Sequence, residues 1–195
     1  DILPVGNVDT FAICFYPIGF ANFVKTPLEN LVDKETPISE LFGQVAAYEL
    51  EQQMIQAINT RQRIEIVETF LLKILSEKNT ISNIVKTTVE ALLKTNGTTP
   101  INVLLNDDIS KRRQLERHFK KQIGISPKQL GKAIRLQTTL NLLLNKKSET
   151  LTEIAYESDY FDQNHFIKDF KDLVGVTPKE FLANEHMALS ALFYK

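Results

Sequence analysis

The order of apolar and polar residues predicts a mainly α-helical chain that opens with one short strand. From Val8 to Tyr16 both alternating sets of positions are apolar, which is the pattern of a strand buried on both faces. Pro17 and Gly19 end this pattern. Because a lone strand is not stable in water, its partner strands are expected to precede Asp1.

Beyond this strand, apolar residues recur at the spacing of three and four that places them on one face of a helix. One amphipathic helix is predicted from Ile38 to Ile58, a second from Ile64 to Leu75 and a third from Ile81 to Leu93. Threonine followed by proline marks a helix start, because the hydroxyl caps the helix and proline fits its first position. Three such pairs occur at Thr26-Pro27, Thr36-Pro37 and Thr99-Pro100.

The second half of the chain contains an internal repeat with an offset of 51 residues. Residues 119–130 align with residues 170–181 without a gap, and Phe, Lys, Gly, Pro and Lys coincide. The same offset places Asp108 over Asp159. A fixed offset maintained over such a stretch indicates a duplicated structural unit.

Each copy predicts a short helix, a tight turn and a longer helix. In the second copy Thr150 and Glu153 can form a capping box, which starts a helix at Leu151. Asp159, and Asp108 in the first copy, are expected in the left-handed conformation that a sharp turn requires. The elements that follow are the helices 110–123 and 162–174, the helix stops Gly124 and Gly175, and new helices from Pro127 and Pro178.

An ordered series of short motifs runs through both copies. It comprises Arg135-Leu136, Leu142-Leu143, Glu153-Ile154-Ala155, Tyr160-Phe161-Asp162-Gln163, His165-Phe166, Phe170-Lys171 and Gly175-Val176-Thr177-Pro178. This series resembles the AraC/XylS family of bacterial transcription regulators over roughly residues 80 to 185. The resemblance implies two helix-turn-helix subdomains, at about 100–124 and 151–175, joined by a linker helix at about 127–145.

A shorter resemblance concerns the start of the chain. Residues 15–20 (Phe-Tyr-Pro-Ile-Gly-Phe) and 38–43 (Ile-Ser-Glu-Leu-Phe-Gly) resemble the end of an uncharacterised sensory domain found upstream in some regulators of this family. The expected domains are therefore 1–78, the C-terminal remnant of that sensory domain, 79–185, the DNA-binding domain, and 186–195, a C-terminal tail.

Charge is strongly segregated although the whole chain carries a net charge of only -1. Residues 110–147 hold 11 basic residues and one acidic residue, Glu116, whereas residues 1–109 sum to -6 and residues 148–195 to -5. A solvated helix face would usually interleave acids with bases. A single basic band in a nearly neutral chain instead favours a polyanionic partner, and with the predicted fold that partner is nucleic acid.

By the resemblance, the second helix of each unit enters the DNA major groove. Arginine can bridge guanine O6 and N7, and Gln or Asn can pair with adenine N6 and N7. The linker helix would be roughly 27 Å long, close to the roughly 34 Å between successive major-groove faces. The residues implied in the groove are Arg112, Arg113 and Arg117 with Gln163, Asn164, His165 and Lys168, and those expected at phosphates are Lys111, Lys120, Lys121, Lys128 and Lys132. The alternative for any one of them is a solvated side chain.

Catalytic residues, metal ligands and cofactors are not expected. His118, His165 and His186 have no Cys or carboxylate partner at metal-ligand spacing. Cys14, the single cysteine, is predicted in the middle of the buried strand and cannot form an internal disulfide, which fits a reducing cytoplasm. A membrane span needs about 18 consecutive apolar residues, and no apolar run in the sequence is that long.

The hypothesis from sequence is a cytoplasmic transcription regulator that binds double-stranded DNA. RNA polymerase and an unidentified small-molecule effector of the upstream domain are further expected partners, and a homodimer is left open. The alternatives are a helical protein-interaction module that does not bind DNA and, less favoured, an enzyme that depends on Cys14.

Overall fold

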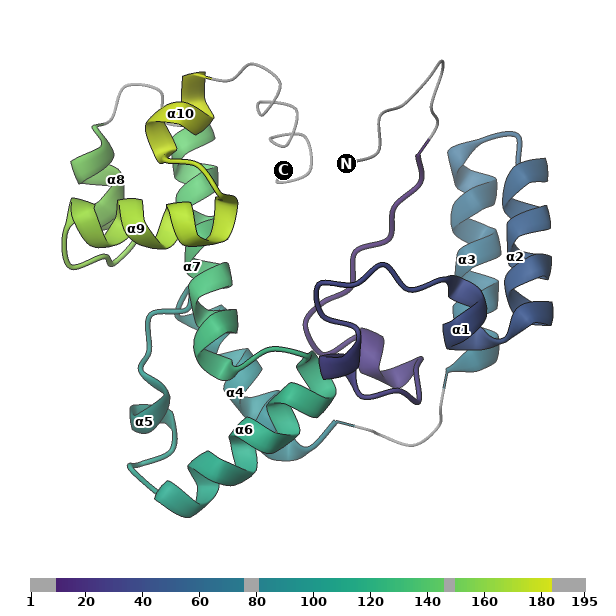
Figure 1. Cartoon of the computed structure of the whole chain (residues 1–195), viewed down its shortest axis with the longest axis horizontal. Helices are drawn as coiled ribbons and strands as arrows, with labels where there is room; N and C mark the ends of the chain where they lie inside the picture. The colour runs from purple at the N-terminus through teal and green to yellow at the C-terminus, as the bar shows by residue number, and fades with distance from the viewer. Residues whose placement is uncertain (1–9, 76–80, 146–149, 184–195) are drawn as a thin grey trace. The chain divides into compact units, whose positions relative to one another are not determined.

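The computed structural model describes residues 10–75, 81–145 and 150–183 and is mainly helical, as predicted (Figure 1). The described residues divide into two compact units. The first contains residues 10–26 and 36–75, and the second contains residues 27–35 and 81–183.

The first unit consists of short helices. Its elements are η1 (Phe20–Asn22), α1 (Ile38–Phe42), α2 (Gln44–Gln56) and α3 (Thr60–Ile74). α2 packs against both α1 and α3. The single helix predicted from Ile38 to Ile58 is therefore wrong, because Gly43 adopts φ 90° and separates α1 from α2.

The strand predicted from Val8 to Tyr16 is not formed in residues 10–16, the part of it that the structure describes. Ile13 is 47% exposed, and Cys14 is exposed rather than buried. A strand requires a neighbouring strand to satisfy its backbone N–H and C=O groups, and no described residue supplies one. Phe15 instead packs its ring against two phenylalanine rings in and after η1.

The second unit is organised around α7, the helix that spans Pro127–Asn145. α4 packs against α5, α6 and α7, whereas α8 and α9 pack against α7, and α10 packs against α9. The remaining elements are η2 (Leu28–Asn30), α4 (Asn83–Lys94), α5 (Ile101–Leu104), α6 (Ile109–Ile123), α8 (Leu151–Glu157), α9 (Gln163–Val174) and α10 (Pro178–Ala183).

Apolar side chains are buried toward both ends of α7. On one side, α4 buries Val85, Val89 and Leu92, while α6 buries Leu115 and Phe119. Each such side chain stabilises the fold by about 1.5–3 kcal/mol when fully buried, so these residues fix which face of α6 meets the core. On the other side, the cluster comprises Leu136, Leu140, Leu143, Ile154, Ala155, Tyr160, Phe166, Phe170 and Phe181.

The predicted capping box of α8 is confirmed. The Thr150 amide donates to Glu153 Oε2 over 2.7 Å, and the Glu153 amide donates to Thr150 Oγ1 over 3.3 Å. The hydrogen bonds that the Thr150 amide and then the Thr150 hydroxyl donate to the Glu153 carboxylate lower the pKa of that carboxyl. The side chain of Asp162 similarly caps α9 by accepting from the His165 amide.

The two interhelical turns differ in length by one residue. Four residues separate α5 from α6, and five separate α8 from α9. Asp159 has φ 56°, as predicted for the turn between α8 and α9. The prediction for Asp108 is wrong, because this residue has φ -73° and caps α6 by accepting from the Lys111 amide. Asn106 and Asp107 take the left-handed conformation instead, since α5 ends at Leu104 and the chain must turn before Asp108 can cap the next helix.

Residues 27–35, which we call the strap, belong to the second unit although the residues on either side in sequence belong to the first. η2 of the strap packs against α6, and Leu28 is buried. A Cβ at Gly124, which ends α6 with φ 93°, would lie 2.9 Å from Val32 Cγ2 and 3.2 Å from the Leu28 carbonyl oxygen. The strap thus packs closely against the C-terminal end of α6.

Candidate nucleic-acid interface

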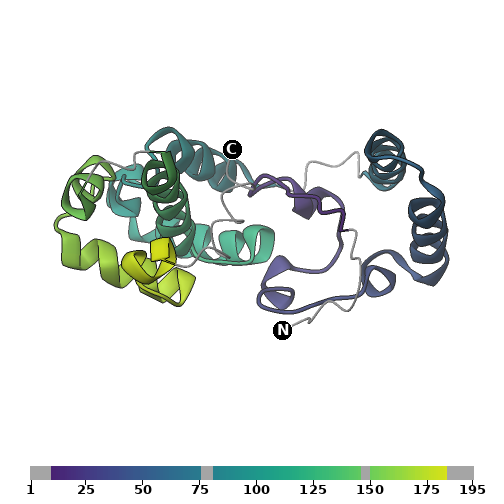
Figure 2. The ribbon, with the colours of Figure 1, turned by 90° about the horizontal axis from the view of Figure 1, so that it is seen from above.

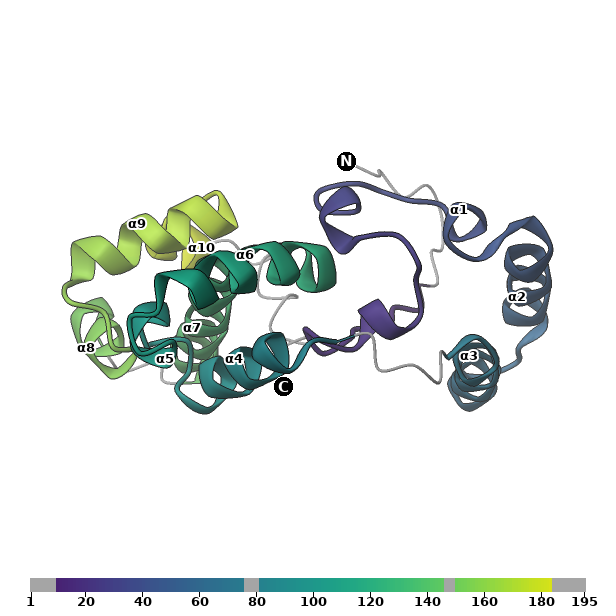
Figure 3. The ribbon, with the colours of Figure 1, turned by 90° about the horizontal axis from the view of Figure 1, so that it is seen from below.

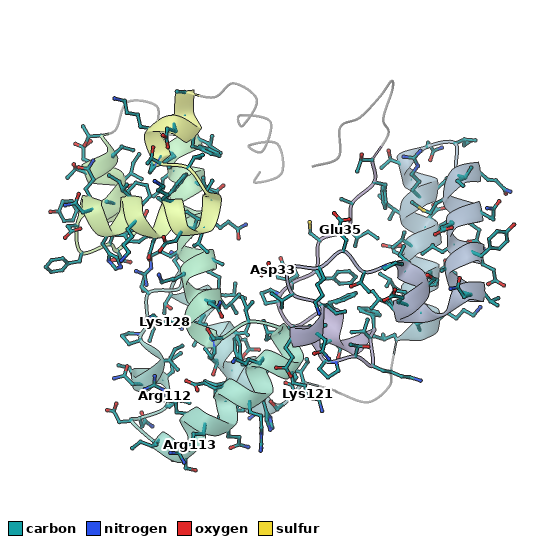
Figure 4. All side chains as sticks on the ribbon, in the orientation of Figure 1. Asp33, Glu35, Arg112, Arg113, Lys121 and Lys128 are labelled. Carbon is teal, nitrogen blue, oxygen red and sulfur yellow. The ribbon has the colours of Figure 1, made fainter. Side chains whose placement is uncertain are left out.

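The exposed side of α6 carries four basic side chains. Leu115 and Phe119 bury one face of this helix completely. On the opposite face, the spacing i, i+4, i+7 and i+8 aligns four exposed residues that have no ion pair with any residue the structure describes. These residues, which we call the α6 basic stripe, are Arg113, Arg117, Lys120 and Lys121. Figure 4 shows the first and the last of them at the two ends of the helix.

Two other basic residues of α6 have acidic partners on the same surface. Lys111 Nζ lies 3.5 Å from Asp108 Oδ2, and Arg112 Nε lies 3.4 Å from Glu116 Oε1. The Lys111 amide, which donates to the Asp108 carboxylate, is the main cause of the lowered pKa of that carboxyl. Exposed pairs of this kind are worth about 0–1 kcal/mol, so phosphate groups could replace these carboxylates at little cost.

The second predicted recognition helix, α9, has the same layout with fewer charges. Phe166 and Phe170 are fully buried. Asn164 and Lys168, one turn apart, are exposed on the other side. His165 lies on the flank between these two faces, with 47% of its side chain exposed.

Gln163, in the first turn of α9, is half-buried and contacts the preceding helix. Its side-chain oxygen accepts a hydrogen bond of 2.8 Å from Thr152 Oγ1 of α8. The structure therefore presents Asn164, His165 and Lys168 at the surface, while it holds Gln163 against α8.

The helices α6 and α9 share one side of α7. The view nearly along α7 in Figure 2 and the opposite view in Figure 3 both place α6 and α9 on the same side of it. Figure 1 shows them toward opposite ends of α7, each beginning on the side where α5 and α8 lie. The N-terminal turns that carry Arg113 and Asn164 are thus at the same side of the unit.

A cleft of 810 Å³ lies between the two helix pairs. The loop at residues 97–100, the start of α6, the N-terminal half of α7 and two residues of α9 line it. Lys128 in the first turn of α7 is exposed beside this cleft and has no ion pair among the described residues (Figure 4).

Lys132, which is expected at a phosphate, has a buried carboxylate as its partner in the structure. Its Nζ lies 2.6 Å from Asp169 Oδ1 of α9, and the Asp169 carboxylate is buried. Nearby, the Arg135 guanidinium lies 5.1 Å from the centre of the Tyr160 ring and donates to the Gly97 carbonyl over 3.1 Å. Burial, and then the Asp169 carboxylate, raises the pKa of the Tyr160 phenol.

The sequence does not single out Asp169, because its partner lies 37 residues away and neither residue belongs to a local motif. No group of three or more His, Cys, Asp or Glu residues that could hold a metal ion occurs in residues 10–75, 81–145 and 150–183. Within the same ranges, no helix is both long and apolar enough to cross a membrane.

Comparison with known proteins identifies a domain within the second unit. Residues 110–184 match the family model described as a helix-turn-helix domain. Over 70 residues the chain is 39% identical to the HTH-type transcriptional regulator MtrA of Neisseria gonorrhoeae, a match that covers 36% of this chain and 23% of that protein. The matched region is thus less than a quarter of that regulator's length, and no solved structure matches the chain. Residues 110–184 therefore form a helix-turn-helix domain of the AraC type.

Proposed function

We propose that this chain is a sequence-specific DNA-binding transcription regulator that inserts α6 and α9 into adjacent major-groove segments. The observation that carries the proposal is the α6 basic stripe: four exposed cations, unpaired among the described residues, opposite a buried apolar face. An α-helix fits the major groove, and unpaired cations gain most from phosphate contact because they give up no partner.

The residues of α6 are proposed to divide between bases and phosphates. Arg113 lies in the first half of α6, where a recognition helix presents side chains to base edges, and Arg117 follows one turn later on the same face. Lys120 and Lys121 in its last turn, with Lys128 in the first turn of α7, are suited to phosphates on either side of the cleft. Lys111 and Arg112 are proposed to exchange their exposed carboxylate partners for DNA.

α9 is proposed to contribute more to discrimination than to affinity. It has only Lys168 and Lys171 as basic residues, and the exposed Asp172 opposes them. Base contacts from Asn164, His165 and Lys168 must therefore offset the repulsion between the helix's acids and DNA. α6, with six basic residues against Glu116, is proposed to anchor the complex.

Because the two helix pairs follow one another in a single chain, one chain can contact both groove segments, and the DNA site need not be palindromic. The spacing supports this proposal, since α7 has 19 residues and is about 28 Å long. Successive major-groove faces lie about 34 Å apart.

The proposal includes a sensory domain before the DNA-binding domain and partners other than DNA. Residues 1–78 are proposed to be the end of a sensory domain, whose small-molecule effector the sequence does not identify. RNA polymerase is a further proposed partner, a homodimer is left open, and a DNA target would place the chain in the cytoplasm.

The test is selection of bound fragments from random DNA, followed by half-site analysis with two variants. Arg113→Ala should cost about 1–3 kcal/mol of binding free energy through one half of the selected site. Asn164→Ala should cost less affinity and relax the preference at one base pair in the other half. Lys94→Ala, which removes an exposed charge from α4, is the control and should change neither half. Unchanged footprints with both variants would show that α6 and α9 do not face the groove.

A protein-interaction module without DNA binding is the second candidate. One face of α2 exposes Val45, Tyr48 and Ile55, and exposed apolar residues at helical spacing are typical of a protein contact. Absence of any complex in retardation assays at low salt, together with retained helical structure, would favour this function. The Cys14-dependent enzyme stays the least favoured alternative, because the chain matches a helix-turn-helix domain over residues 110–184 and is similar to a transcriptional regulator.

A further inference from the structure

The carboxylate of Asp169 is buried in the helix that is proposed to read DNA. The residue is 3% exposed, and its two oxygens have different neighbours. Oδ1 lies 2.6 Å from Lys132 Nζ on α7, and Oδ2 lies 3.7 Å from His165 Nε2, one turn earlier on α9. Because a buried carboxylate without a partner is strongly destabilising, Lys132 must remain beside it in the folded unit.

We propose that Asp169 and Lys132 are positioning residues for base recognition by α9, an inference that rests on the proposed DNA-binding function. Their ion pair fixes the rotation of α9 about its own axis relative to α7. The second carboxylate oxygen lies 3.7 Å from His165 Nε2, so the position of Asp169 also sets the negative charge beside the His165 ring at the edge of the cleft. Neither residue contacts DNA itself.

A buried ion pair is a better determinant of geometry than of stability. Apolar packing holds α9 on α7 through Phe166 and Phe170, and apolar contacts tolerate small rotations. The ion pair does not tolerate such rotations, because its energy depends on the 2.6 Å distance between Lys132 Nζ and Asp169 Oδ1. Replacement of such a pair by apolar residues of similar size is often neutral or stabilising, so its contribution must be sought in specificity.

A series of contacts connects His165 of α9 with the loop before α5. Its ring meets the Tyr160 ring edge to face at 5.6 Å, and Arg135 lies over the same Tyr160 ring. Arg135 also donates to the carbonyl of Gly97, in the loop before α5. Asp169 of α9 is thus connected through α7 to the loop before α5, the first helix of the other pair.

The inference changes the role of Lys132. A lysine that contacts phosphate releases counterions when DNA binds. Its loss makes the negative slope of log K against log salt less steep by about 0.9. A lysine that remains paired with a buried carboxylate releases none. Lys132→Met should therefore leave the slope as steep as in the parent, whereas Lys128→Met should make it less steep by about 0.9.

The decisive experiment compares Asp169→Asn with Asp172→Asn, an exposed acid on the same helix that has no ion pair among the described residues. Both variants remove one negative charge. The readout is discrimination, the ratio of dissociation constants for the selected site and for a site with one changed base pair in the α9 half. Asp169→Asn should reduce this ratio from about tenfold or more to below about threefold. Asp172→Asn should leave the ratio unchanged while it strengthens binding to both sites.

A double variant separates positioning from stability. In Asp169→Leu with Lys132→Met, an apolar pair replaces the ions, so the thermal midpoint should return close to that of the parent. Discrimination in the α9 half should remain lost. Recovery of discrimination along with stability would overturn the proposal, because it would show that the ion pair only holds the fold together.

An observation without DNA keeps this inference distinct from the proposed function. In the NMR spectrum of the free protein, Asp169→Asn should shift the ring resonances of His165, and Asp172→Asn should leave them in place. Failure of the parent to bind any selected DNA would refute the proposed function. An unmoved His165 signal in Asp169→Asn, or discrimination retained by that variant, would refute the positioning role.

Discussion

Replacement of Lys120 and Lys121 by alanine tests whether the basic band meets DNA phosphates. Both residues are exposed, lie in the last turn of α6 and have no ion pair among the residues described. Their removal should not affect the core, because Leu115 and Phe119 bury the opposite face. The double variant therefore isolates an electrostatic contribution.

The magnitude follows from the number of cations proposed to meet phosphates. Lys120, Lys121 and Lys128 have no ion pair among the described residues, and Lys111 and Arg112 are proposed to exchange their exposed carboxylate partners for phosphates. Lys132 is not counted, because it is paired with the buried Asp169. Five phosphate contacts predict a slope of log K against log salt of about -4.5, which is about a 500-fold loss of affinity between about 50 and 200 mM salt. Three remaining contacts in the double variant predict a slope of about -2.7 and a loss of about 40-fold.

The assay is fluorescence anisotropy of a labelled duplex titrated at several salt concentrations. The matched control is Lys86→Ala with Lys94→Ala, which removes two exposed charges from α4 of the same unit. The control should retain the slope of the parent. Equal slopes for the two double variants, or a parent slope near zero, would refute the assignment of the band to phosphates.

Further predictions concern stability, measured by chemical denaturation. Gly124→Ala and Gly175→Ala should each cost about 1–2 kcal/mol for a positive φ, and Gly124→Ala should cost more because its Cβ meets the strap. Equal costs would argue against the strap contact. Phe170→Ala should cost about 3–5 kcal/mol, and a loss below about 1 kcal/mol would contradict its complete burial. The pKa of Glu153 is lowered in the folded state, mainly by the Thr150 amide, so its stabilisation is present above pH 4.5 and lost as the pH falls below it. Glu153→Gln should therefore weaken the acid dependence of stability, and an identical dependence in parent and variant would contradict the capping role.

Local signals in the sequence predicted much of the second unit. The helix Pro127–Asn145 has the predicted bounds, since a cap, a proline and a regular apolar stripe define it without reference to other segments. The capping residues Thr150 and Glu153 and the helix stops at Gly124 and Gly175 also need only their neighbours. Such features depend on hydrogen bonds within about four residues and are therefore visible in the sequence.

Features that depend on distant partners could not be predicted in this way. The apolar stretch at residues 10–16 has strand periodicity, but pairing decides whether a strand forms. Helical spacing places Arg113 and Arg117 opposite the apolar face, yet it does not reveal which basic residues are already paired. Lys132 resembles the other lysines of the band in sequence, and only the packing of α9 on α7 brings it to Asp169.

Methylation interference on the selected DNA tests most directly whether α6 and α9 enter adjacent major-groove segments. Methyl groups at guanine N7 lie in the major groove, whereas those at adenine N3 lie in the minor groove. Guanine methylation should block binding in two segments about 10 base pairs apart, and Arg113→Ala should abolish the interference in one of them only. Interference confined to a single segment, or to adenine N3, would contradict the insertion of two helices into successive major-groove faces.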